Sequence, residues 1–212
     1  MSETPSDPLT LALPKGRLLD QTQEYLAARG LRFRVEKRKL VAYDEEGMLK
    51  IILVKNSDLP VYVTHGIAGL GICGADVIYE SGQSFFKLHE FDFGGTTMCL
   101  ATRRDYNPEG DRGHMTVATK FTRYARDYFH RRGMPVELIK LNGSVELAPV
   151  LGLAPYIVDL VETGSTLEAN DLVVRQELER IGVHLIANPA YYKFHYSRVN
   201  EFLRLLRKSP EE

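Results

Sequence analysis

Two acids and a run of small, hydroxyl-bearing residues stand together in residues 157–172, IVDLVETGSTLEANDL. Asp159 and Glu162 close an apolar segment that is typical of a buried strand, and the turn TGST (163–166) follows directly. When such a turn opens a helix, its backbone N–H groups point at one spot, which the helix dipole makes attractive to an anion. Gly164 lets the backbone come close to a ligand. The segment therefore predicts a phosphate-binding turn.

The two acids need a different partner, because a phosphate repels them. Asp159 lies four residues before Thr163, where it can accept hydrogen bonds from sugar hydroxyls. A sugar with a phosphate at one end and a diol nearby, such as a phosphoribosyl compound, satisfies both features. A capped helix is the alternative, with Thr163 or Ser165 as N-cap and Glu168 completing a capping box. The turn lacks the Lys of the G-x-x-x-x-G-K-[ST] loop, which argues against an ordinary nucleotide hydrolase.

Cations that suit further phosphate groups follow the first apolar segment. PKGR (14–17) places Lys15 and Arg17 there, with Gly16 between them. Arginine can fork two phosphate oxygens, so Arg17 suits a pyrophosphate better than a lysine does. Arg38, in EKRKL, is a second candidate, with a solvated run of Lys and Arg as its alternative.

Two further segments supply candidate contacts. Gly71, Gly74 and Asp76 of GLGICGAD form a small-residue edge that a flat adenine or a ribose can approach; a tight strand-to-helix turn capped by Asp76 is the alternative. Glu146, after a Gly-Ser turn in NGSVELAP, is expected to face ribose or Mg²⁺, and its alternative is a first-turn acid favoured by the helix dipole. The six histidines have no metal-ligand spacing.

Hydrophobic periodicity predicts the elements that position these residues. The expected strands are 9–14, 40–43, 48–55, 68–74, 91–104, 115–119, 136–140, 156–161 and 183–188. The expected helices are 16–30, one beginning at 57–60, 75–81, 121–133, 144–152, one beginning at Ser165, and 197–208, with a polar loop at 105–114. This alternation predicts an α/β fold with a mostly parallel sheet. We expect two lobes, 1–101 with 184–212 and 102–183, and a ligand cleft between them.

Composition limits the function classes. A net charge of −1 argues against a broad nucleic-acid surface. The polar start MSETPSDP does not look like a secretory signal, and no stretch approaches the roughly 20 apolar residues of a membrane span. Cys73 and Cys99 lie in apolar surroundings, which indicates buried thiols in a reducing compartment. The expected location is the cytoplasm.

Four long segments together resemble a known family: LALPKGRL (11–18), residues 57–80, 117–133 and 141–172. In this order they resemble ATP phosphoribosyltransferase, the first enzyme of histidine biosynthesis, in its short form. The resemblance implies a two-lobed fold like that of type II periplasmic binding proteins. It implies transfer of the phosphoribosyl group of phosphoribosyl pyrophosphate (PRPP) to N1 of the adenine of ATP, with Mg²⁺ held mainly by substrate phosphates. It also implies a homodimer within a hetero-oligomer that contains a regulatory subunit related to histidyl-tRNA synthetase.

The resemblance and the residue chemistry together assign roles. The PRPP-binding residues are Glu146, Asp159, Glu162, Thr163, Gly164, Ser165 and Thr166. The catalytic cations are Lys15, Arg17 and Arg38, and the ATP-binding residues are Lys15, Gly16, Arg17, Gly71, Gly74 and Asp76. The first lobe is the ATP side, and the second carries the turn for the PRPP phosphate. The sequence departs from the family pattern at Lys55, often Arg, and at Gly69 and Pro155, often Asp.

Three rival functions use the same features. A solute-binding protein of this fold class would normally carry an export signal. A type I phosphoribosyltransferase also has acids and a Thr-Gly-x-Thr turn, but it is one compact domain and does not account for LPKGRL or GLGICGAD. A non-catalytic scaffold is disfavoured because the turn, both acids and KGR are all present.

Overall fold

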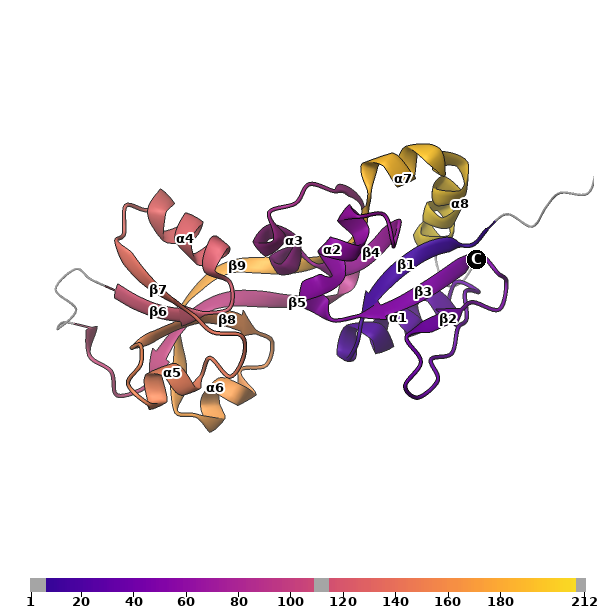
Figure 1. The fold of residues 1–212 in the computed structure, drawn as a ribbon. Coiled ribbons are helices and arrows are strands. Elements are labelled where there is room, and N and C mark those ends of the chain that lie inside the picture. Colours follow the sequence, from indigo (N-terminus) through magenta and orange to yellow (C-terminus); the bar gives the residue numbers. More distant parts are fainter. Residues whose placement is uncertain (1–6, 109–114, 209–212) are drawn as a thin grey trace, which may run out of the picture. The chain divides into compact units, whose positions relative to one another are not determined.

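The computed structural model describes residues 7–108 and 115–208 (Figure 1). The first residues of the chain and most of the predicted 105–114 loop therefore lie outside the described residues. The strands are β1 (Leu9–Pro14), β2 (Val41–Tyr43), β3 (Leu49–Val54), β4 (Leu70–Gly74), β5 (Phe86–Arg103), β6 (Met115–Thr119), β7 (Val136–Lys140), β8 (Tyr156–Val161) and β9 (Leu172–Ala187). The helices are α1 (Arg17–Ala27), η1 (Asn56–Asp58), α2 (Leu59–Thr64), α3 (Ala75–Ser81), α4 (Thr122–Arg131), α5 (Leu147–Val150), α6 (Ser165–Ala169), α7 (Pro189–Phe194) and α8 (Tyr196–Arg207).

The predicted alternation of strands and helices is confirmed, with differences at the two longest strands. β5 begins at Phe86, ahead of the predicted 91, and β9 begins at Leu172, whereas we expected a strand only from 183. Most side chains in the first half of β9 are exposed, so no apolar periodicity marks that half as a strand. Its backbone pairing with a sheet neighbour holds it instead. Helix α7 was not predicted.

Within the described residues the strands form one nine-stranded sheet in the order β2-β3-β1-β4-β9-β5-β8-β6-β7. β1 pairs in parallel with β3 and β4, and β6 pairs in parallel with β7 and β8. β2–β3, β4–β9 and β5–β8 are antiparallel. The sheet is therefore mixed, and the expected parallel pairing is found within two groups of strands, β3-β1-β4 and β8-β6-β7.

The chain divides into two compact units, unit 1 (residues 1–94 and 182–212) and unit 2 (residues 95–181). β5 and β9 each contribute residues to both units, because the chain crosses from one unit to the other within these strands. Unit 1 therefore contains the predicted PKGR turn, and unit 2 contains the predicted phosphate-binding turn.

Helices cover both faces of the sheet in unit 1. Leu11 and Leu13 of β1 belong to one buried cluster with residues of α1 and α8. Ala12, between them in sequence, belongs to a second cluster with residues of α2 and α3. Successive side chains of a strand point to opposite faces, so β1 is buried on both sides and reads as a continuous apolar run.

In unit 2 the helices α5 and α6 lie on one side of the strands and α4 lies on the other (Figure 1). Val145, Ala148 and Leu167 share a buried cluster with Ala118 of β6 and Ile157 of β8. The segments that carry Glu146 and the TGST turn are therefore anchored in the same core. In the described part of the chain, none of the helices has the length and apolarity that crossing a membrane requires.

Gly69, one of the departures from the family pattern, lies against the ring of Tyr191 in α7. A Cβ on Gly69 would overlap that ring. The ring is fixed because Tyr191 Oη accepts a hydrogen bond from the backbone N–H of Thr10 (3.1 Å). The Gly69 N–H donates to Thr10 Oγ1 (2.7 Å), so the same residue of β1 anchors both partners.

Gly69→Ala is expected to lower the free energy of unfolding by about 1–3 kcal/mol, because the added methyl forces the Tyr191 ring off Thr10. Urea unfolding measures this change. In a Tyr191→Ala background the same methyl should cost less than about 0.5 kcal/mol, since the clash is gone. Equal costs in the two backgrounds would contradict the contact.

Candidate functional site

The TGST turn opens α6 with one long side-chain hydrogen bond, from the Ser165 N–H to Thr163 Oγ1 (3.5 Å). Gly164 is the N-cap residue, with φ 79° and ψ −2°, a left-handed conformation that favours glycine. The full capping box is not formed, because the N-cap residue is Gly164 and the bond that joins Glu168 to this turn is between backbone groups, Glu168 N–H to Gly164 O (3.0 Å). The Thr163 half of that alternative remains as the long bond from the Ser165 N–H. Thr163 Oγ1 and Ser165 Oγ lie 3.1 Å apart and both side chains are exposed. The hydroxyls and backbone N–H groups of the turn thus form one exposed polar cluster, in which Thr163 Oγ1 is bonded to the Ser165 hydroxyl and, more weakly, to the Ser165 N–H.

Asp159 lies on β8, ahead of this turn. Its side chain is 17% exposed, and its Oδ1 accepts a hydrogen bond from the Leu160 N–H (2.9 Å). Lys120, which follows β6, places Nζ 3.3 Å from the same oxygen. Sequence reasoning did not select Lys120. The available signal was its position directly after a strand, since ligands of open α/β sheets bind beyond such strand ends.

The two remaining acids of unit 2 flank the turn. Glu162 is exposed and immediately precedes Thr163. Glu146 is half-buried and is the N-cap residue of α5. α5 and α6 contribute to the same buried cluster, so Glu146 and the turn belong to neighbouring helix starts of one unit.

In unit 1 the PKGR turn emerges from the buried end of β1. Pro14 is buried, whereas Lys15, Gly16 and Arg17 are exposed. Gly16 has φ 93° and is the N-cap residue of α1, so a residue with a side chain would be strained there. The predicted positions of Lys15 and Arg17 at a strand-to-helix turn are confirmed.

A hollow of about 370 Å³ beside this turn is lined by Lys15, Leu40, Leu53, Val54, Lys55, Asn56, Asp58 and Tyr62. Pro14 of β1 is paired with Val54 of β3 in parallel register, so Lys15 and Lys55 follow paired residues. The lining contains two lysines and one aspartate, and Leu40 and Tyr62 add apolar surface. This combination suits an anionic ligand with a flat apolar part. The sequence alone singled out Lys55 only as a departure from the family pattern.

Arg38 lies two residues before Leu40, which lines the same hollow. Its φ is 67°, which is uncommon for a residue with a side chain. It lies in the turn closed by the hydrogen bond from Lys39 N–H to Glu36 O (3.1 Å), and its side chain is exposed. Backbone strain of this kind often accompanies functional sites.

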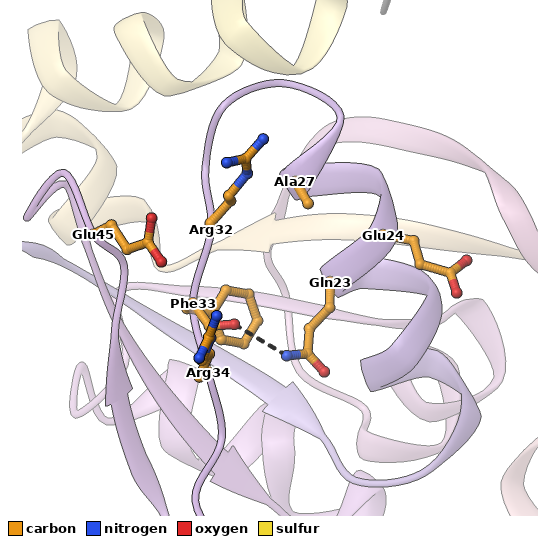
Figure 2. A pocket seen from close by; sticks show the side chains of 7 residues that line it. All are labelled: Gln23, Glu24, Ala27, Arg32, Phe33, Arg34 and Glu45. Carbon is orange, nitrogen blue, oxygen red and sulfur yellow. Dashed lines mark hydrogen bonds between the residues drawn. The ribbon is translucent and has the colours of Figure 1, made fainter.

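A second hollow of unit 1, of about 320 Å³, has a different character (Figure 2). It is lined by Gln23, Glu24, Ala27, Arg32, Phe33, Arg34 and Glu45. Gln23 Nε2 donates to the Phe33 carbonyl (3.2 Å) across it. Two guanidinium groups are balanced by two carboxylates, and Glu45 precedes β3, at the strand's amino end. The hollow beside Lys15 is therefore the better anion site.

The GLGICGAD segment forms β4 and the start of α3. On Gly71 a Cβ would stand 2.7 Å from Leu59 Cδ2, so this glycine lets α2 pack on β4. Gly74 is the N-cap residue of α3, and Asp76 is buried in its first turn. Burial and the nearby Asp76 raise the pKa of the Cys73 thiol, which therefore stays protonated at neutral pH. The described cysteines are both free and buried.

The structure thus gathers the predicted residues into separate groups. In unit 1, Lys15, Gly16 and Arg17 share one turn. Arg38 lies two residues before Leu40, which lines the hollow beside that turn. Gly71, Gly74 and Asp76 lie on β4 and α3. In unit 2, Asp159, Glu162 and the TGST turn share one strand–turn–helix segment, and Glu146 starts a neighbouring helix. Among the residues that the structure describes, no three His, Cys, Asp or Glu side chains converge as a metal-binding group would.

The chain is similar to known proteins over nearly its whole length. Residues 55–208 match the family model described as HisG: ATP phosphoribosyltransferase. An ATP phosphoribosyltransferase from Clostridioides difficile (strain 630) is 38% identical over 204 residues, which cover 95% of this chain and 98% of that relative.

Two solved structures place the fold. The ATP phosphoribosyl transferase (HisG:HisZ) complex from Thermotoga maritima matches with a TM-score of 0.81 and 35% identity, over 96% of this chain and 98% of that chain. The periplasmic aliphatic sulphonate binding protein SsuA from Escherichia coli matches with a TM-score of 0.62 over 94% of this chain and 71% of that chain. At 12% identity the second match concerns the fold alone, and it confirms the expected likeness to periplasmic binding proteins. On the family model, the relatives and the fold together, the chain belongs to the ATP phosphoribosyltransferase family.

Proposed function

We propose that this chain carries out its family's reaction, the first step of histidine biosynthesis, with unit 2 holding PRPP and unit 1 holding ATP. The reaction joins ATP and PRPP into N1-(5-phosphoribosyl)-ATP and releases pyrophosphate. The observation that carries the assignment is the exposed, hydroxyl-bearing turn around Gly164, with Asp159 on the strand before it. An anion site and a hydroxyl-binding acid on one segment fit a phosphorylated sugar.

In unit 2 we assign the 5′-phosphate of PRPP to Thr163, Gly164, Ser165 and Thr166. Their backbone N–H groups and hydroxyls donate to phosphate oxygens, and the α6 dipole favours the negative charge. The carboxylates of Asp159 and Glu162 accept hydrogen bonds from the ribose diol. Glu146 is assigned to the ribose as well.

In unit 1 we assign the ATP phosphates to the turn of Lys15, Gly16 and Arg17. Lys55 shares the hollow with Lys15 and adds a second ammonium group to it. The edge formed by Gly71, Gly74 and Asp76 is assigned to the nucleoside part of ATP, with Gly71 acting through the packing of α2.

The reaction requires that the two substrates be aligned and that the charge on the leaving pyrophosphate be compensated. The lone pair of adenine N1 forms a bond to C1 of the ribose while the bond from C1 to the pyrophosphate oxygen breaks, and that oxygen keeps the electron pair. The lone pair is already free, so no strong general base is needed. Negative charge grows on the leaving pyrophosphate, and the cations Arg17, Arg38 and Lys15 stabilise it.

A divalent metal fits this arrangement, and we propose Mg²⁺. When bound, it neutralises charge on the substrate phosphates and screens the two anionic substrates from each other. The three acids of unit 2 that we assign to PRPP, Asp159, Glu162 and Glu146, offer few protein ligands. The substrate phosphates would therefore hold most of its coordination sphere.

We further propose a cytoplasmic enzyme that works as a homodimer within a hetero-oligomer, together with a regulatory subunit related to histidyl-tRNA synthetase. The HisG:HisZ complex that this chain resembles supports such a partner. Free, buried cysteines are compatible with a reducing compartment.

The assay is direct. The purified chain, supplied with ATP, PRPP, Mg²⁺ and the regulatory partner, is expected to release pyrophosphate in step with a product whose absorption differs from that of ATP. Omitting either substrate should abolish the release, which excludes simple hydrolysis of PRPP. A preparation that binds both substrates and forms no adduct would contradict the proposal.

A further inference from the structure

Lys120 is built into the end of β6 by contacts that fix its backbone. Thr119 is fully buried and is paired in parallel register with Val158, the residue before Asp159. Its Oγ1 donates to the Val158 carbonyl (2.6 Å) and accepts from the N–H of Phe121 (2.9 Å). The main chain on both sides of Lys120 is therefore tied to β8 and the core, opposite Asp159.

The Lys120 side chain uses this placement to reach one carboxylate oxygen. Nζ lies 3.3 Å from Asp159 Oδ1 and 4.8 Å from the centroid of the buried Phe121 ring. Oδ1 also accepts the Leu160 N–H, so both donors that the described residues bring to Asp159 go to the same oxygen. Neither contact is made through Oδ2, so that oxygen can accept from a further donor.

The carboxylates around the turn explain why a cation is needed beside Asp159. Asp159 and Glu162 place carboxylates next to a turn that we assign to a phosphate, and like charges at such distances repel. An ammonium group on Oδ1 offsets the Asp159 charge without using Oδ2. The Lys120 side chain is 43% exposed, and half-exposed ion pairs contribute little to folding stability, so a role in ligand binding accounts for it better.

We propose that Lys120 is a positioning residue for PRPP. It holds Asp159 through Oδ1, so that Oδ2 accepts the ribose hydroxyls while the negative charge beside the phosphate turn is reduced. This inference rests on the proposed function, because it presumes that Asp159 meets the ribose.

The test is calorimetric titration of the full-length chain with PRPP and, separately, with ribose 5-phosphate. Lys120→Met is expected to raise both dissociation constants by a similar factor of about tenfold, the scale of one hydrogen bond to a charged group. Lys120→Arg should restore most of the affinity. Lys140→Met is the matched control, since Lys140 is exposed at the end of β7, one strand farther from β8, and should change neither constant.

The double variant Lys120→Met/Asp159→Asn separates direct from indirect action. If Lys120 acts through Asp159, the double variant binds no more weakly than Asp159→Asn alone. Three results would each overturn the inference. The first is a double variant whose dissociation constant rises by the product of the two single-variant factors. The others are a Lys120→Met variant that binds PRPP more weakly but ribose 5-phosphate normally, and one whose dissociation constants stay within about twofold of the parent values. If Asp159→Asn and Gly164→Val both bind PRPP normally, the PRPP site itself is misassigned and the inference falls with it. If Asp159→Asn and Gly164→Val bind PRPP more weakly while Lys120→Met binds it normally, the PRPP site stands and the role of Lys120 is rejected.

Discussion

Gly164→Val is expected to raise the dissociation constant for PRPP by at least about 100-fold, the equivalent of two lost hydrogen bonds to a charged group. Gly164 has φ 79°, a conformation that a β-branched residue adopts only under strain. The turn would relax toward a negative φ and rotate the N–H groups at the start of α6 away from the phosphate. A Cβ at this position meets no clash, because the nearest atom to it is Val161 Cγ1 at 4.0 Å. The loss would therefore come from backbone direction.

Strain alone also lowers stability, so a matched glycine is needed as a control. Gly133 belongs to the same unit, has φ 65° and has open space where a Cβ would stand. Gly133→Val should lower the free energy of unfolding by a similar amount and leave PRPP binding unchanged. Calorimetric titration and urea unfolding of both variants provide the comparison. Normal PRPP binding by Gly164→Val would remove the turn from the site.

Arg17→Ala is expected to lower kcat by about 10²–10³, the scale seen when one preorganised donor to a developing anion is removed. Arg17 is the first residue of α1 and is exposed on the turn after β1. Its guanidinium can donate two parallel hydrogen bonds to the leaving pyrophosphate. The dissociation constant for ATP should also rise, because Arg17 is assigned to the ATP phosphates, but by a smaller factor than kcat falls, since the charge on the leaving pyrophosphate grows in the transition state.

Two variants sharpen this experiment. Arg17→Lys keeps the positive charge but loses the two parallel donors of the guanidinium, so its kcat should lie between those of the parent and Arg17→Ala. Arg32→Ala removes an exposed arginine of the same unit, from the hollow in Figure 2, and should leave kcat unchanged. Single-turnover and steady-state rates in saturating substrates give the values. If Arg17→Ala turns over like Arg32→Ala, then Arg17 does not act in the reaction.

Much of the candidate site could be predicted because it is local in sequence. The TGST turn, Asp159 and Glu162 belong to one strand–turn–helix segment, and Lys15, Gly16 and Arg17 belong to another. In each case one glycine with a positive φ permits the turn. Strand and helix periods place such segments without knowledge of the rest of the chain.

The contacts between distant segments could not be predicted in this way. Lys120 meets Asp159 because β6 and β8 pair in parallel, and Lys55 joins Lys15 because β1 and β3 do. The first half of β9 was missed because its side chains are mostly exposed and its strand is held by the backbone.

The sequence by itself therefore determined the family, the alternation of elements and the two turns that carry the anion-binding chemistry, since these depend on residue type at short spacing. Only the tertiary structure decided which cation stands beside which acid, and that Tyr191 rather than an acid fills the space at Gly69. Register and packing between strands remote in sequence set these contacts, and a one-residue shift in register would replace every neighbour.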